Sequence, residues 1–482
     1  MRLPLASALC GLALAAPLSW AQPDFTEQAK HISHAPVDAA IAHALSAIEP
    51  SRIDLTIETL VRFKTRNSLS SMSQDLPQGT GVEAAADWIA AEFGRISTEC
   101  GGCLEVRRDT FVADPAAANG SSWAGRIPKP TRMTNVYAIL KGTDPVQSKR
   151  MYLVTGHYDS RNTNVLDAEG FAPGANDDAS GVAVSLECAR ALSRLHLPAT
   201  VVFVAVAGEE QGLVGSAHLA HLAKDQGWQL EAVLNNDIVG GNTTPGDKLQ
   251  MKDRVRVFSE GVPVAATPEQ ARRIRALGGE NDSPSRAVAR FMQSTAHTYF
   301  PDSSATPFTA FLVSRPDRYL RGGDHSSFNH EGFAAVRLTE WREDFNHQHQ
   351  NVVQPPAGSS DPVLGDLKEF VDFNYVAKVA RLNAATLASL AASPGQPAKV
   401  SIQTEKLENG TTLRWESAPG AVDHYDLVWR ETTASDWQYV QPVASQGTGA
   451  PITITVPISK DNVIFGVRAV DAAGHQGLVV VP

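Results

Sequence analysis

Histidine and carboxylate residues follow three short apolar runs of this chain. The runs cover residues 151–154, 200–207 and 232–234. The ionisable residues that come directly after them are His157, Asp159, Glu209, Glu210 and Asp237. Ligand sites in open α/β sheets gather beyond the carboxyl ends of the strands. If the runs are neighbouring strands, these side chains border one crevice.

A glycine-flanked loop, residues 173–181, adds Asp177 and Asp178 between the first two runs. Alone, this pair is typical of a helix cap. Several carboxylates in one crevice repel one another, and a bound cation removes that cost. One carboxylate that bridges two ions, each completed by a histidine and a further carboxylate, suits a pair of Zn²⁺ ions. Calcium would not need the histidine, and the pattern offers no thiolate.

Two of these residues fit supporting roles. Asp159 is placed to accept the other ring N–H of His157, which would fix the tautomer of the imidazole. Glu209 and Glu210 are adjacent, so their side chains project differently from a turn. One can bind metal while the other takes a proton from water.

Four motifs occur in order and carry a resemblance. They are Gly-His157-Tyr-Asp159-Ser, Gly-Ala-Asn-Asp177-Asp178-Ala-Ser-Gly, Glu209-Glu210-Gln-Gly-Leu-Val-Gly-Ser and Asn-Asp237-Ile-Val-Gly. Over roughly residues 50–390 the chain resembles the bacterial double-zinc aminopeptidases, relatives of glutamate carboxypeptidase. The resemblance implies that Asp177 bridges both metals, with a cis peptide to Asp178. It also implies that His157 and Asp237 complete one site, that Glu210 and a later histidine complete the other, and that Glu209 is the general base.

The later histidine has two candidates, His347 and His349. In the family, the ligand is commonly followed four residues later by Asp. Asn351 stands at that distance from His347, so we expect His347 to be the ligand. Asn346 stands where some members carry a Tyr beside the ligand. The segment from Gly323 to His325 resembles the family's Asp-His segment, which borders the active site and is not expected to bind metal.

Strand-like runs alternate with helix-like stretches such as residues 82–96 and 182–195. This alternation predicts an α/β fold, a three-layer αβα sandwich around a mostly parallel mixed sheet. We expect the peptidase-like domain over residues 51–391, with an insertion of little regular structure at about 242–320. A linker at 392–398 leads to residues 399–482, whose alternating strands predict an all-β sandwich that resembles a fibronectin type III domain.

Composition limits the partners and the compartment. The 482 residues include 42 basic and 52 acidic side chains, a net charge of −10, which argues against nucleic-acid binding and a polybasic membrane anchor.

Residues 1–21 are typical of an export signal, and residues 22–50 of a leader or activation segment. No other run is long enough to span a membrane. We expect a structural disulfide between Cys100 and Cys103, and a buried free thiol at Cys188.

The sequence therefore predicts an exported aminopeptidase with two Zn²⁺ per chain. It would hydrolyse the N-terminal bond of peptides with a free N-terminus, by a metal-bridging hydroxide with Glu209 as the base. A glutaminyl cyclase or a carboxypeptidase-like relative on the same fold is the alternative. A third hypothesis is a binding protein without catalytic activity. The sequence leaves the oligomeric state and the preferred N-terminal residue open.

Overall fold

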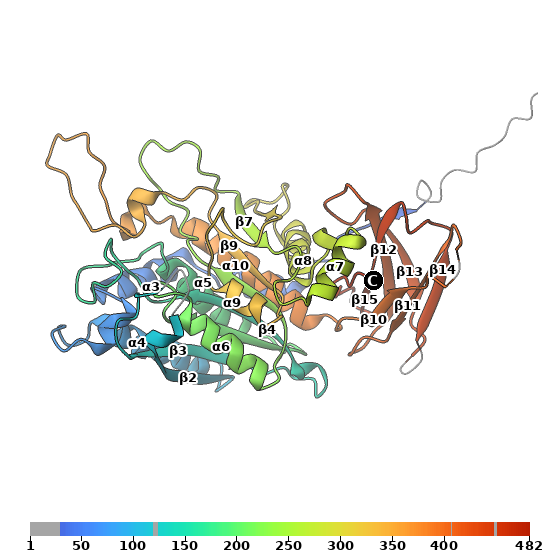
Figure 1. Ribbon diagram of the computed structural model, residues 1–482, viewed down its shortest axis with the longest axis horizontal. Coiled ribbons are helices and arrows are strands. Elements are labelled where there is room, and N and C mark those ends of the chain that lie inside the picture. Colours follow the sequence, from blue (N-terminus) through green and yellow to red (C-terminus); the bar gives the residue numbers. More distant parts are fainter. Residues whose placement is uncertain (1–28, 119–123, 406, 448–450) are drawn as a thin grey trace, which may run out of the picture.

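The computed structural model describes residues 29–118, 124–405, 407–447 and 451–482. Figure 1 shows an α/β domain beside a smaller β domain formed by the end of the chain. The predicted export signal at 1–21 lies outside the described residues.

The α/β domain is organised around a mixed sheet with the strand order β2-β3-β5-β4-β6-β9-β7-β8. The central strands β5, β4, β6 and β9 are parallel, and β2, β3 and β7 introduce the antiparallel pairs. The strand bounds are β2 (Leu104–Ala113), β3 (Thr131–Leu140), β4 (Arg150–His157), β5 (Thr200–Val206), β6 (Gln229–Asn236), β7 (Arg254–Ser259), β8 (Thr309–Val313) and β9 (Ala335–Thr339). This arrangement confirms the predicted fold class.

Helices cover both faces of the sheet because its central strands are apolar on both sides. Tyr152 and Val154 of β4 pack in the larger hydrophobic cluster, whereas Leu153 between them belongs to the cluster on the opposite face. The helices of the first face are α3 (Pro50–Arg62), α4 (Gly81–Glu99), α5 (Ala179–Leu192), α8 (Pro284–Tyr299) and α10 (Phe373–Ala392). Those of the second are α6 (Val214–Asp225) and α9 (His325–His330).

Residues 242–320 are more regular than expected. They contain β7, α7 (Pro268–Ala276), α8 and β8, and the two strands extend the central sheet. The prediction of an insertion with little regular structure is therefore wrong. The sequence analysis missed β7 because Arg254 and Arg256 alternate with the buried Val255 and Val257 and make the segment look polar. Helix α8 begins where the side chain of Ser283 caps the amide of Arg286.

The C-terminal domain has two antiparallel sheets, β10-β11-β14 and β1-β13-β12-β15. The strands are β10 (Ala398–Ile402), β11 (Thr411–Glu416), β12 (His424–Glu431), β13 (Tyr439–Ala444), β14 (Ile452–Val456) and β15 (Val463–Val470). Trp415, Trp429 and Phe465 form much of the core that the sheets enclose. The architecture is compatible with a fibronectin type III domain, and that assignment stays a prediction.

The described part of the expected leader segment is built into both domains. Strand β1 (Lys30–His31) pairs with β13, and α2 (Ala39–Leu45) packs on α10 and α5. The ring of His475 joins these parts, since Nε2 lies 2.9 Å from Asp38 and Nδ1 2.8 Å from Asp471. Asp38 in turn caps α2. Residues 29–50 thus link the two domains.

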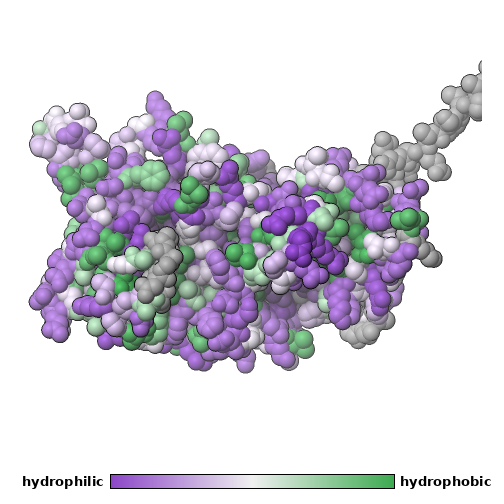
Figure 2. Space-filling model, viewed as in Figure 1, coloured by the Kyte–Doolittle hydropathy of each residue, from purple (hydrophilic) through white to green (hydrophobic). Residues whose placement is uncertain are grey.

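Other expectations concern the cysteines and the surface. Cys100 and Cys103 form a disulfide, and Cys188 is a buried free thiol, as predicted. Among the described residues, no helix is both long and apolar enough to cross a membrane. Figure 2 shows a largely hydrophilic face on which hydrophobic residues are scattered.

Candidate active site

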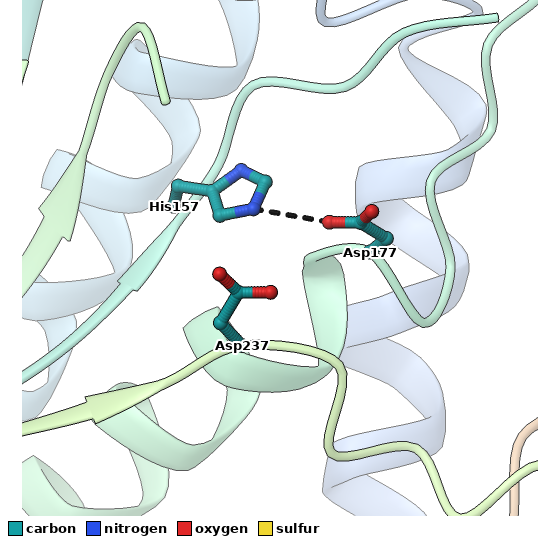
Figure 3. Close-up of side chains that lie close together, drawn as sticks. All are labelled: His157, Asp177 and Asp237. Atoms are coloured by element: carbon teal, nitrogen blue, oxygen red, sulfur yellow. Dashed lines mark ion pairs between the residues drawn. The ribbon is translucent and has the colours of Figure 1, made fainter. Parts of the chain in front are cut away.

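The structure brings together His157, Asp177 and Asp237 at the carboxyl ends of the central strands (Figure 3). His157 ends β4, Asp237 directly follows β6, and Asp177 lies in the loop before α5. Their ligand atoms lie within 4.8 Å of one another, and all three residues are buried. His157 Nε2 is 3.0 Å from Asp177 Oδ1. The sequence predicted this convergence.

A second group consists of Asp177, Glu210 and His349, with the same 4.8 Å limit between ligand atoms. His349 Nε2 lies 2.7 Å from Asp177 Oδ2 and 2.9 Å from Glu210 Oε1. Asp177 thus belongs to both groups, with Oδ1 facing His157 and Oδ2 facing His349. This is the arrangement expected of a carboxylate that bridges two ions.

The expectation that His347 completes the second group is wrong in this structure. Its ring stacks on Phe370, with centroids 3.5 Å apart, and its Nδ1 faces Thr244 Oγ1 at 3.2 Å and Asn242 Oδ1 at 3.3 Å. The chain turns between the two histidines, and His349 has a φ of 56°. This turn directs His349, and not His347, to the carboxylates.

Burial and charge act against each other in both groups. Burial lowers the pKa of His157, but its contacts with Asp159 and Asp177 outweigh burial and raise the pKa well above its usual value. Likewise, burial opposes the charge of His349, yet Glu210 and Asp177 raise its pKa to about 10. The carboxylates therefore create a strong demand for positive charge.

The donor set fits zinc. Glu210 Oε1 is buried and lies 2.9 Å from His349 Nε2, so two ligand atoms of this group face each other. A buried carboxylate is costly unless a cation or hydrogen-bond donors offset its charge. Imidazole nitrogens and carboxylate oxygens are ligands that Zn²⁺ prefers, and each group offers one nitrogen.

The loop that carries Asp177 is held by residues that the sequence analysis missed. Asp366 accepts the backbone N–H groups of Asn176 and Asp177, each at 2.7 Å. Arg66 is fully buried and donates to three carbonyls around the site, those of Tyr158, Pro173 and Gly174. Both residues are far from the loop in sequence, and no local pattern marks them.

Asp178 secures the other side of the loop. Its carboxylate accepts the amide of Gly181 at 2.9 Å in the first turn of α5, and the amide of His157 at 3.0 Å. The Asp177–Asp178 peptide is cis, as the resemblance implied. Asp178 therefore joins the end of β4 to the start of α5.

Asp159 acts differently from the expectation. His157 Nδ1 is 3.1 Å from the backbone carbonyl of Asp159 and 3.5 Å from its carboxylate. The carboxylate instead accepts the amides of Glu209 and Glu210, at 3.2 and 3.1 Å. Asp159 therefore orients His157 through its main chain and holds the Glu209–Glu210 turn through its side chain.

Glu209 and Asp324 complete the acidic surroundings. Burial raises the pKa of Glu209 well above its usual value, and burial raises that of Asp324 to about 7. Neither residue belongs to the two groups of metal-ligand atoms. An ionic contact restrains Asp237, whose Oδ1 lies 2.7 Å from Nη2 of the buried Arg337.

The fold and the site together define a metal-dependent hydrolase. Residues 135–361 match the model of Peptidase family M28. The chain is 43% identical to a "Probable zinc metalloprotease" of Pyricularia oryzae over 482 residues, 98% of this chain and 89% of that protein. It is 42% identical to a "Probable zinc metalloprotease" of Leptosphaeria maculans, covering 90% and 95% of the two chains. The chain therefore belongs to peptidase family M28 and is a zinc metalloprotease.

Among solved structures, the chain is similar to the LapA aminopeptidase of Legionella pneumophila. The TM-score is 0.48 and the sequence identity 17%, with 75% of each chain covered.

Proposed function

We propose that this metalloprotease is an aminopeptidase that holds two zinc ions. His157, Asp177 and Asp237 would bind one ion, and Asp177, Glu210 and His349 the other. The observation that carries the proposal is the position of Asp177, whose two oxygens face the two histidines at 3.0 and 2.7 Å. Bound zinc would polarise the scissile carbonyl and lower the pKa of water at the site.

Glu209 is the proposed general base. Its raised pKa, which burial causes, favours a carboxylate that accepts a proton and then releases it. It would take the proton of the attacking water and deliver it to the leaving amine. The Asp159 carboxylate, which binds the amides of Glu209 and Glu210, would keep the base beside the zinc ligand.

The acidic surroundings support selection of a free N-terminus. Besides the groups that would bind zinc, the carboxylates of Glu209 and Asp324 lie at the site, and the charges of these two interact. In their ionised form these carboxylates would attract a protonated α-amino group, whereas an acetylated one carries no charge. The substrates would accordingly be peptides with a free N-terminus.

We also propose that the protein is exported, as residues 1–21 predict. The Cys100–Cys103 disulfide supports this location, because disulfides persist in oxidising compartments.

The proposal is tested with a panel of aminoacyl chromogenic amides, each beside its N-acetylated twin, with and without a chelator. Chelator-sensitive cleavage of the free-amine member alone is the expected result. Equal cleavage of both twins would refute aminopeptidase selectivity. Cyclisation of N-terminal Gln without hydrolysis would favour the glutaminyl cyclase instead.

A further inference from the structure

Two arginines stand beside the second metal-ligand group. Arg161 lies four residues after His157, with its Nε 3.1 Å from Glu210 Oε2 and its Nη2 2.8 Å from His349 Nδ1. Arg126 donates from Nη1 to the backbone carbonyl of Glu210 at 2.8 Å. Two positive charges thus approach Glu210 from its side chain and its main chain.

The two guanidinium groups are close enough to disfavour each other. The positive charge of Arg161 acts on Arg126, and the carboxylates of Glu210 and Glu209 act on it in the opposite direction. Arg161 Nε is itself buried and has Glu210 Oε2 as its ionic partner at 3.1 Å. Neither arginine is needed to bind a cation, and both would oppose one by charge. An additional anion beside them would be attracted by both guanidinium groups.

The proton on His349 leads to the same conclusion. An imidazole that offers Nε2 to a metal keeps its hydrogen on Nδ1, and this N–H needs an acceptor. Arginine has no acceptor atom, so Nη2 of Arg161 cannot fill that need. With zinc bound, the 2.8 Å contact would place two donors face to face. An oxygen atom that accepts from both would satisfy them.

We propose that Arg161, with Arg126 beside it, binds a carboxylate of the substrate. The planar fork of a guanidinium matches the two oxygens of a carboxylate, a group that peptides carry. The carboxylate comes from one of two sources: the side chain of an acidic N-terminal residue, or the C-terminus of a short peptide such as a dipeptide. This inference rests on the proposed function and adds a class of preferred substrate to it.

The experiment compares substrates that differ only in the carboxylate. One arm uses aspartyl and glutamyl 4-nitroanilides against their asparaginyl and glutaminyl counterparts, and the other uses alanyl dipeptides against the same dipeptides with an amidated C-terminus. We expect the wild-type protein to prefer the carboxylate in one arm by about 10- to 100-fold in kcat/KM, the range of a charge-assisted hydrogen bond. In Arg161→Gln the ratio falls to about one.

A matched control is Arg132→Gln. Arg132 is a half-exposed arginine whose Nε lies 3.3 Å from Glu83, and this variant should keep the wild-type ratio. The arm in which the preference occurs identifies the source of the carboxylate. A wild-type protein that cleaves free-amine substrates without any such preference would overturn the inference and leave the proposed function standing. A wild-type protein that cleaves none of them would instead refute the proposed function.

A binding measurement separates substrate recognition from catalysis and from zinc loading. In the Glu209→Gln background, calorimetry gives the Kd of the same dipeptides and their amides, with and without Arg161→Gln, after the zinc content of each variant is measured. We expect the variants to have equal zinc content. The Kd of the amidated dipeptide divided by the Kd of the free dipeptide should fall about 10- to 100-fold when Arg161 is replaced. Loss of zinc in Arg161→Gln would overturn the inference, as would an equal loss of affinity for both members of a pair.

Discussion

Replacing His349 by alanine should remove one zinc ion per chain, whereas replacing His347 should remove none. His349 supplies the single nitrogen of the second group, 2.7 Å from Asp177 and 2.9 Å from Glu210. Loss of a residue that only supports a ligand weakens metal binding about 10- to 100-fold. Loss of the ligand itself should exceed that, and we expect at least ~100-fold weaker binding of one zinc.

His347→Ala should have the opposite signature. The ring is buried against Phe370, so its removal leaves a cavity and should lower the free energy of unfolding by about 2–3 kcal/mol. Zinc content after dialysis against a zinc buffer, together with urea unfolding, measures both effects. If His347→Ala lost a zinc ion and His349→Ala kept both, the placement of these histidines would be refuted.

Four further outcomes are expected. Glu209→Gln should keep its zinc but lose about 10²- to 10⁴-fold in kcat, the usual contribution of a general base; near-normal turnover would remove Glu209 from that role. The Asp366 carboxylate accepts two buried backbone amides at 2.7 Å, and Asp366→Ala would leave both unpaired. This variant should lower the free energy of unfolding, measured in urea, by about 3–5 kcal/mol. An unchanged urea midpoint would contradict the role of Asp366 in holding the loop. Removal of zinc by a chelator should lower the melting temperature, because a ligand at 1,000 times its Kd stabilises the folded state by about 4 kcal/mol; a melting temperature that does not respond to added zinc would argue against a native metal site. Burial lowers the pKa of His475, but Asp471 and Asp38 raise it above its usual value, so the folded state binds the proton more tightly than the unfolded chain. The resulting stabilisation is complete below about pH 6.5 and is lost as pH rises through the raised pKa. His475→Gln should therefore lower the melting temperature more at pH 5.5 than at pH 9, and an equal difference at both pH values would refute the linkage.

The central strands and most of the site could be predicted because each signal is local. Buried parallel strands consist of short runs of β-branched residues, and the functional residue comes directly after the run. His157 ends β4, and Asp237 directly follows β6. Since parallel strands end at one edge of the sheet, the positions along the chain were enough to bring these side chains together.

The remaining parts depend on contacts that no local pattern encodes. His349 reaches the site because the chain turns after His347, at a residue with positive φ, and the spacing to Asn351 favoured the wrong imidazole. Asp366 holds a loop that lies 189 residues earlier in the chain. Strand β7 was missed because the arginines that alternate with its valines made the segment look polar.

The central claim is that Asp177 bridges two zinc ions. A crystal structure of the zinc-loaded protein, with anomalous data on both sides of the zinc absorption edge, tests it most directly. We predict two anomalous peaks on either side of the Asp177 carboxylate, one beside His157 and Asp237 and the other beside Glu210 and His349. A single peak, or a peak at His347, would contradict this account.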